Sequence, residues 1–97
     1  MATYIALCNW TQQGIEAVKD SPKRLAAARK AFKDGGAKLK DFYLTMGAYD
    51  FVVVAEAPDD DSMARAALSV AATGAIRTTT MRAFPEKDYR AIIASLP

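Results

Sequence analysis

The sequence predicts a ferredoxin-like α+β fold, a four-stranded antiparallel sheet with two helices on one face. Segments with strand periodicity and with helical periodicity alternate in the order β-α-β-β-α-β, followed by a short terminal helix. With right-handed crossovers this order gives a split β-α-β arrangement. At 97 residues the chain is predicted to be a single domain spanning residues 1–97.

The first half of the chain supplies a strand and a helix. In residues 3–9 apolar side chains occupy both alternating positions, which is typical of a central strand covered on both sides. Gly14 is interpreted as a local breaker, followed by a loose helical turn. Ser21 is predicted to cap a helix with Pro22 in its first turn, and Gly35-Gly36 to end it through positive φ angles.

A β-hairpin is predicted next. Residues 38–46 form its first strand, residues 47–49 the turn and residues 50–57 the second strand, the most strand-prone segment of the chain. Phe42 is assigned to one face of the hairpin and Tyr43 to the other, because alternate side chains point in opposite directions.

The last part of the chain gives a helix, a strand and a tail helix. Asp59, Asp60 and Asp61 lie at the positive end of a helix over residues 62–73. Residues 75–84 then alternate as a strand, and residues 86–96 form a helix. The apolar positions of that tail helix share one face and are Tyr89, Ile92, Ile93 and Leu96.

The sheet is predicted to have an uncovered face. Tyr4 and Cys8 belong to one face of the first strand and Ile5 and Leu7 to the other, yet two helices cover only one of them. An exposed apolar sheet face of this size is normally an interface. The chain is therefore predicted to form a homo-oligomer, most simply a dimer with its sheets packed face to face.

Composition excludes several function classes. Histidine is absent and Cys8 is the sole cysteine, so no metal site, cofactor or disulfide is predicted. The net charge of +2 is too small to indicate a nucleic-acid surface, and no apolar run is long enough for a membrane span. With no signal peptide recognised in the first residues, the expected location is cytoplasmic.

The segment Gly47-Ala48-Tyr49-Asp50, followed by "FVVVAEAPDD", closely resembles the GYD domain family. The N-terminal "TYIALCNWTQQGIEAVKDSPKR" and the later "GAIRTTTMRAF" are similar to that family as well, so the resemblance covers nearly the whole chain. It implies the dimeric α/β-barrel superfamily and says little about activity. A shorter pattern, Gly47, Tyr49 and Asp50 followed by "GAIRTTT", also resembles the effector-binding domain of the leucine-responsive regulators, where a small ligand sits between subunits.

Tyr49 and Asp50 are the residues of this segment that a hairpin does not require. One interpretation is architectural, with Asp50 accepting N–H bonds across the hairpin and Tyr49 packing on a neighbouring subunit. The other has Asp50 fixing a ligand amine or hydroxyl, with Tyr49 as a wall of the pocket.

Five further residues are candidates for ligand binding. Trp10 ends the first strand and serves either as a cap on the core or as a pocket wall. Arg77 is either solvated or paired with a carboxylate such as Glu56, or it binds a ligand carboxylate through bidentate hydrogen bonds from its guanidinium. Three other side chains are expected on the same face as Arg77: Tyr4, Tyr43 and Thr79. No catalytic residue is assigned, and Cys8 is expected to be inert.

Three functions are compatible with these residues. The favoured hypothesis is a non-enzymatic module that binds or senses a small metabolite near a subunit boundary. The alternatives are a small cofactor-free enzyme, resembling a monooxygenase or an isomerase, and a purely structural assembly protein.

Overall fold

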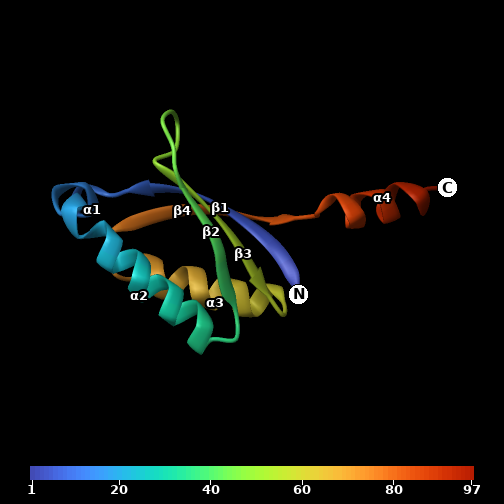
Figure 1. The fold of residues 1–97 in the computed structure, drawn as a ribbon, viewed down its shortest axis with the longest axis horizontal. Coiled ribbons are helices and arrows are strands. Elements are labelled where there is room, and N and C mark those ends of the chain that lie inside the picture. The colour runs from blue at the N-terminus through green and yellow to red at the C-terminus, as the bar shows by residue number, and fades with distance from the viewer.

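The four strands form one antiparallel sheet in the order β2-β3-β1-β4 (Figure 1), in a computed structural model that describes residues 1–97. The two central strands, β3 and β1, are not consecutive in the chain, which is the split arrangement that the sequence predicts. The predicted ferredoxin-like fold is therefore confirmed. The strands are β1 (Ala2–Trp10), β2 (Lys38–Leu44), β3 (Phe51–Ala57) and β4 (Ile76–Ala83).

Helices α2 and α3 lie side by side across one face of this sheet (Figure 1). The remaining helical elements are peripheral, and none of the helices is long and apolar enough to cross a bilayer. In chain order the helical elements are α1 (Gln12–Glu16), the short 3-10 turn η1 (Val18–Asp20), α2 (Ser21–Asp34), α3 (Asp60–Ala71) and α4 (Glu86–Ala94).

The core lies between the sheet and these two helices. Phe32 of α2 and Met63 of α3 are both buried against alternate side chains of the central strands. Those strand residues are small where the helices come closest: Ala55 and Ala57 of β3 are completely or almost completely buried. Small side chains at these positions leave room for a helix to lie close to the sheet.

The opposite face of the sheet carries no helix, and we call it the open face. In one of its cross-strand rows Ile5 of β1 lies opposite Val54 of β3 and Met81 of β4. Ile5 and Val54 are only partly buried and Met81 is exposed. The uncovered apolar face that the sequence predicts is therefore present.

Gly14 is not the breaker that the sequence indicates, because it lies inside α1 and is buried. A Cβ atom on Gly14 would lie 1.9 Å from the carbonyl oxygen of Ala75, the residue just before β4. That same oxygen accepts the N–H of Thr11 at 3.0 Å, and the Thr11 hydroxyl oxygen accepts the N–H of Gly14 at 3.1 Å. Glycine is required at position 14 because the backbone of α1 contacts the backbone of Ala75 there.

Two predicted element boundaries also differ. Ser21 does not cap α2; it already has helical angles, φ −58° and ψ −35°, because η1 runs directly into the helix. At the other end only Gly36 has a positive φ, +81°. The strand β2 ends at Leu44, two residues earlier than predicted; Thr45 still donates its N–H to the carbonyl oxygen of Asp50, and the chain turns at Gly47, whose φ is +145°.

We predict that Gly14→Ala destabilises the protein by about 2 kcal/mol or more, because the new methyl group overlaps a carbonyl that cannot retreat without losing its hydrogen bond. Urea unfolding followed by circular dichroism measures the change. Gly35→Ala is the matched control: its φ is −87° and its Cβ would lie 3.5 Å from the nearest atom, so its effect is expected within about 0.5 kcal/mol. Equal effects of the two substitutions would contradict the close-approach argument.

Candidate functional site

The turn that carries the Gly47–Asp50 motif is closed by Thr45. The Thr45 N–H donates to the Asp50 carbonyl at 2.9 Å, and the Thr45 hydroxyl donates to the Tyr49 carbonyl at 2.6 Å. Gly47 has φ +145°, in the region that favours glycine. The turn therefore fixes the backbone on both sides of Tyr49, whose side chain is partly buried.

Asp50 is bonded to the end of β1. Its N–H donates to the Cys8 carbonyl, and its carboxylate oxygen Oδ2 accepts the N–H of Trp10, both at 2.9 Å. Asp50 thus accepts a backbone N–H, as the architectural interpretation requires, but the donor belongs to β1 and not to the hairpin strand β2. The carboxylate takes the place of a ladder carbonyl just where β3 begins.

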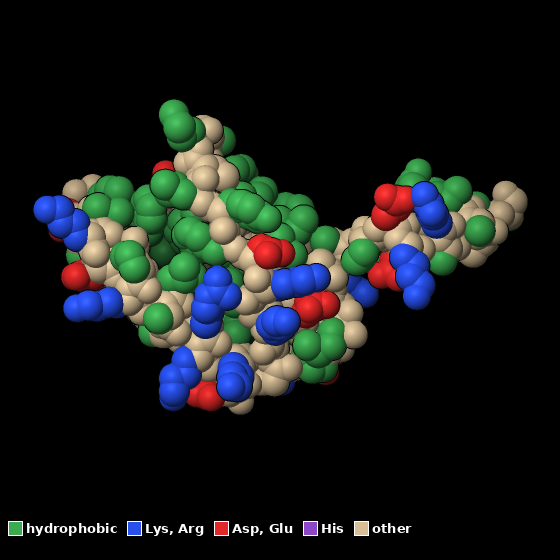
Figure 2. Space-filling model, viewed as in Figure 1, with side chains coloured by type: hydrophobic (Ala, Val, Ile, Leu, Met, Phe, Trp, Pro, Cys, Tyr) green, Lys and Arg blue, Asp and Glu red, His purple; other side chains and the backbone are tan.

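Trp10 is held by this bond at one end of an apolar hollow. Its ring packs on Phe51 with centroids 5.4 Å apart, and Phe51 stacks on Phe42 at 5.1 Å. Leu25 of α2 and Val70 of α3 line the hollow from the helix side. Figure 2 shows hydrophobic side chains gathered around a hollow between α2 and the β2–β3 hairpin.

The hollow has a volume of about 80 Å³. Pockets for small-molecule ligands usually enclose about 300 to 1,000 Å³. A space of this size admits one aliphatic side chain or a few water molecules. The single chain therefore has no enclosed apolar pocket of metabolite size.

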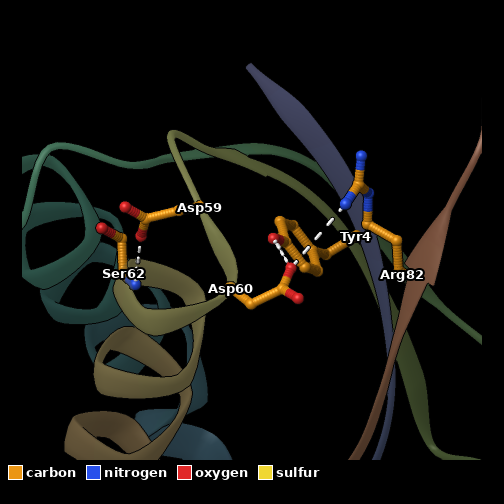
Figure 3. Close-up of polar contacts among 5 residues, drawn as sticks. All are labelled: Tyr4, Asp59, Asp60, Ser62 and Arg82. Atoms are coloured by element: carbon orange, nitrogen blue, oxygen red, sulfur yellow. Dashed lines mark hydrogen bonds and ion pairs between the residues drawn. The ribbon is translucent and has the colours of Figure 1, made fainter.

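Tyr4 lies at the other end of the helix-covered face. Its hydroxyl donates to the Asp60 carboxylate at the start of α3, and Arg82 of β4 approaches the same oxygen at 3.8 Å (Figure 3). The guanidinium also lies over the Tyr4 ring, 5.8 Å from its centroid. The hydrogen bond to Asp60 raises the pKa of Tyr4, because ionising the phenol would remove the donated proton.

The neighbouring Asp59 caps α3, as the sequence predicts for an acidic helix start. Its carboxylate accepts the N–H of Ser62 at 2.8 Å, which lowers the pKa of Asp59 (Figure 3). The contact between Tyr4 and Asp60 has no sequence signal, since 56 positions separate them and only the sheet register brings them together.

The predicted ligand-binding residues do not share one face. Tyr4 is buried under the helices, and Trp10 lines the hollow on the same side, so the expectation that Tyr4 joins Tyr43 and Thr79 is wrong. Strand alternation is the reason, because Tyr4 occupies the parity opposite to Leu7. Tyr43 and Thr79 do belong to one row of the open face, which runs Tyr43, Val52, Leu7, Thr79.

Arg77 lies one row further, opposite Asn9, and is exposed. The predicted pairing of Arg77 with Glu56 is wrong, since Glu56 lies opposite Thr3, six residues away along β1 or about 20 Å. Arg77 forms no ion pair within the chain. It is a free guanidinium at the end of the open face.

Cys8 faces the helices and is buried. Burial raises the pKa of its thiol to about 11, because the thiolate would lose its hydration. Since the thiolate is the reactive form, this position suits a structural residue.

The GYD domain model matches residues 4–93, almost the whole chain. The protein belongs to the GYD domain family. The family resemblance drawn from the sequence is thus confirmed.

A curated relative from Thermus thermophilus is 36% identical over 89 residues, covering 91% of this chain and 94% of the relative. That protein is named glutamine synthetase and cystathionine beta-lyase binding protein.

Solved structures show the same fold at low sequence identity. MtbAldR superposes with a TM-score of 0.68 at 13% identity, over 87% of this chain but 52% of MtbAldR, so the chain corresponds to about half of that protein. A second structure, of a Thermus thermophilus protein, has a TM-score of 0.55 at 21% identity, over 88% of this chain and 95% of its own.

We predict that Asp50→Ala lowers the free energy of unfolding by about 1 to 3 kcal/mol, because the Trp10 N–H loses a charged acceptor. Emission of Trp10, the sole tryptophan, reports the local change in the native state. Asp50→Asn keeps an acceptor oxygen and is expected to lose less. Asp20→Ala removes an exposed carboxylate that makes no hydrogen bond or ion pair and serves as the control; an equal loss there would contradict the anchoring role.

We also predict that native Cys8 resists thiol reagents at about pH 8 and reacts fully once the chain is unfolded. The folded-state pKa is raised, so the stability that this group contributes is present below its ordinary pKa near 9 and is lost as the pH rises towards about 11. Colorimetric thiol titration with and without denaturant measures the reactivity, and urea unfolding at pH 8 and at pH 11 measures the loss of stability. Rapid labelling of the native protein would contradict the burial.

Proposed function

We propose that this GYD domain is an oligomeric binding protein, in which two copies pack through their open faces and the assembly binds other proteins. The observation that carries the proposal is the open face itself. On the central strands its two middle rows hold only apolar side chains, Ile5 and Leu7 of β1 and Val52 and Val54 of β3, and at the edges the rows end in Met81 and Thr79 of β4 and in Asp41 and Tyr43 of β2. Apolar side chains in this number on an uncovered sheet favour a protein contact over exposure to water.

The size of the apolar hollow favours protein binding over a ligand pocket between the sheet and the helices. The helix-covered face encloses about 80 Å³, too little for a metabolite, whereas the open face is broad and bordered by the exposed side chains of Tyr43 and Arg77. An apolar centre with a polar border is the usual anatomy of a protein interface.

The class of partner follows from the curated relative. Its name describes binding to two enzymes, glutamine synthetase and cystathionine beta-lyase. The similarity extends over nearly all of both chains, so every surface of the relative has a counterpart in this protein. We therefore propose an enzyme of this kind as the partner.

A small carboxylate held at the subunit boundary is the second candidate. The observation that favours it is Arg77, which has no partner in the chain and shares the open face with Tyr43 and Thr79. A guanidinium at the border of a dimer interface can bind a carboxylate through two parallel hydrogen bonds. In this version the protein senses a metabolite and the second copy closes the pocket.

We predict that the purified protein binds purified glutamine synthetase or cystathionine beta-lyase in a surface-based binding assay. Met81→Glu, which places a charge on the open face at an exposed position, is expected to weaken self-association and enzyme binding by tenfold or more. Leu68→Glu on α3 replaces another exposed apolar residue, one that lies away from that face, and is the control. Failure of the unmodified protein to bind either enzyme would contradict the proposed partner class.

For the second candidate, we predict that amino acids or other small carboxylates raise the melting temperature, and that Arg77→Gln abolishes the shift while the oligomer persists. Arg77→Lys is expected to retain only part of it, because lysine lacks the two-pronged geometry. A shift that survives in Arg77→Gln would contradict this site.

A further inference from the structure

The chain exposes more surface than a compact protein of its mass. Its accessible area is 6582 Å², whereas a folded monomer of 10.5 kDa exposes about 5,400 Å². Its radius of gyration is 14.5 Å against about 12.5 Å for a compact chain of this length. The excess area, about 1,200 Å², is comparable to the roughly 800 Å² that one protomer buries in a standard protein interface.

Part of this excess comes from α4, which stands away from the sheet and the other helices (Figure 1). We call the segment after β4, residues 84–97, the arm. No residue of α4 is buried. Apolar positions in α4 and just after it recur at helical spacing on one face and are 43 to 61% exposed: Tyr89, Ile92, Ile93 and Leu96. Hydrophobic side chains are visible on this arm in Figure 2, separate from the main body.

A second apolar projection lies at the tip of the β2–β3 hairpin. Tyr43 and Leu44 are 58 and 70% exposed, and Met46 is fully exposed. The two projections lie at opposite ends of the strands. The arm leaves β4 after Ala83, opposite Thr3 at the start of β1, whereas the hairpin turn is bonded to the end of β1.

The arm cannot reach the hairpin of its own chain. The nine residues of β1 span about 30 Å. Two residues link β4 to α4, and the nine-residue helix adds about 14 Å, so the arm extends about 20 Å and points away from the sheet. Any contact between α4 and a hairpin therefore involves a second chain.

We propose that α4 of each copy packs its apolar face on the tip of the β2–β3 hairpin of a second copy. A two-fold axis across the strands reverses their direction, so it brings the arm of each copy to the hairpin of the other and forms both contacts at once. The charges of the arm cancel, with Glu86 and Asp88 against Lys87 and Arg90, so its approach to a like chain meets no net repulsion. This inference rests on the proposed self-association.

The arrangement accounts for the excess surface better than a contact with an unrelated protein. Every chain carries both apolar projections, and a symmetric dimer covers two arms and two hairpins without any third component.

Intermolecular disulfide formation tests the contact directly. Chains carrying Met46→Cys are mixed with chains carrying Ser95→Cys and oxidised under mild conditions; Cys8 does not interfere because it is buried. The expected product is a disulfide-linked pair of the two different chains. Leu68→Cys, an exposed position on α3, replaces Met46→Cys in the control mixture. A yield of mixed dimer no greater than the control would overturn the proposal.

Sedimentation equilibrium measures how much the contact between arm and hairpin contributes to the stability of the dimer. Ile92→Glu in the arm and Met46→Glu at the fully exposed tip of the hairpin are each expected to raise the dimer dissociation constant at least tenfold. Ala91→Glu places the same charge on the opposite side of α4 and is expected to leave it unchanged. Unchanged association in both Ile92→Glu and Met46→Glu would overturn the proposal.

The outcomes separate this inference from the proposed function. If Met81→Glu weakens self-association and Ile92→Glu does not, the result would support the open-face interface and refute the arm contact. Efficient cross-linking between arm and hairpin without enzyme binding would support the arm contact and refute the proposed partner.

Discussion

The structure depends on one constraint: the central strands are apolar on both faces, and the chain supplies helices for only one of them. Tyr4, Ala6 and Cys8 of β1 are buried beneath α2 and α3, whereas Ile5 and Leu7 lie on the open face. Burial of apolar area is the main favourable term in folding, and within one chain only one face of the sheet is buried. The open face, the proposed dimer and the role of the arm all follow from this imbalance.

Polar contacts fix the helix-covered face at both ends of β1. At one end the Asp50 carboxylate accepts the N–H of Trp10 and holds the hairpin turn against the strand. At the other end the Tyr4 hydroxyl binds Asp60 and ties the strand to the start of α3. The sheet is thereby anchored along its length, and the two most distinctive residues of the family motif have different tasks: Asp50 bonds to β1, while Tyr49 provides a carbonyl that closes the turn.

Family membership and fold come from different comparisons. The match over residues 4–93 places the chain in the GYD domain family, while folds shared at 13 and 21% identity show architecture alone. The proposed binding role therefore rests on the chemistry of the surfaces. The hollow of about 80 Å³ is too small for a metabolite, and the broad apolar face is suited to contact with another protein.

The sequence by itself determined the order of elements, the hairpin, the uncovered face and the acidic cap of α3, because each depends on local periodicity or on neighbouring residues. For Asp50 it left two interpretations open, one of which is the acceptance of a backbone N–H. Only the tertiary structure decided which N–H, why Gly14 must be glycine, and that Tyr4 and Tyr43 lie on opposite faces. These features depend on strand register and on approaches between segments as distant as Gly14 and Ala75, which leave no trace in local sequence.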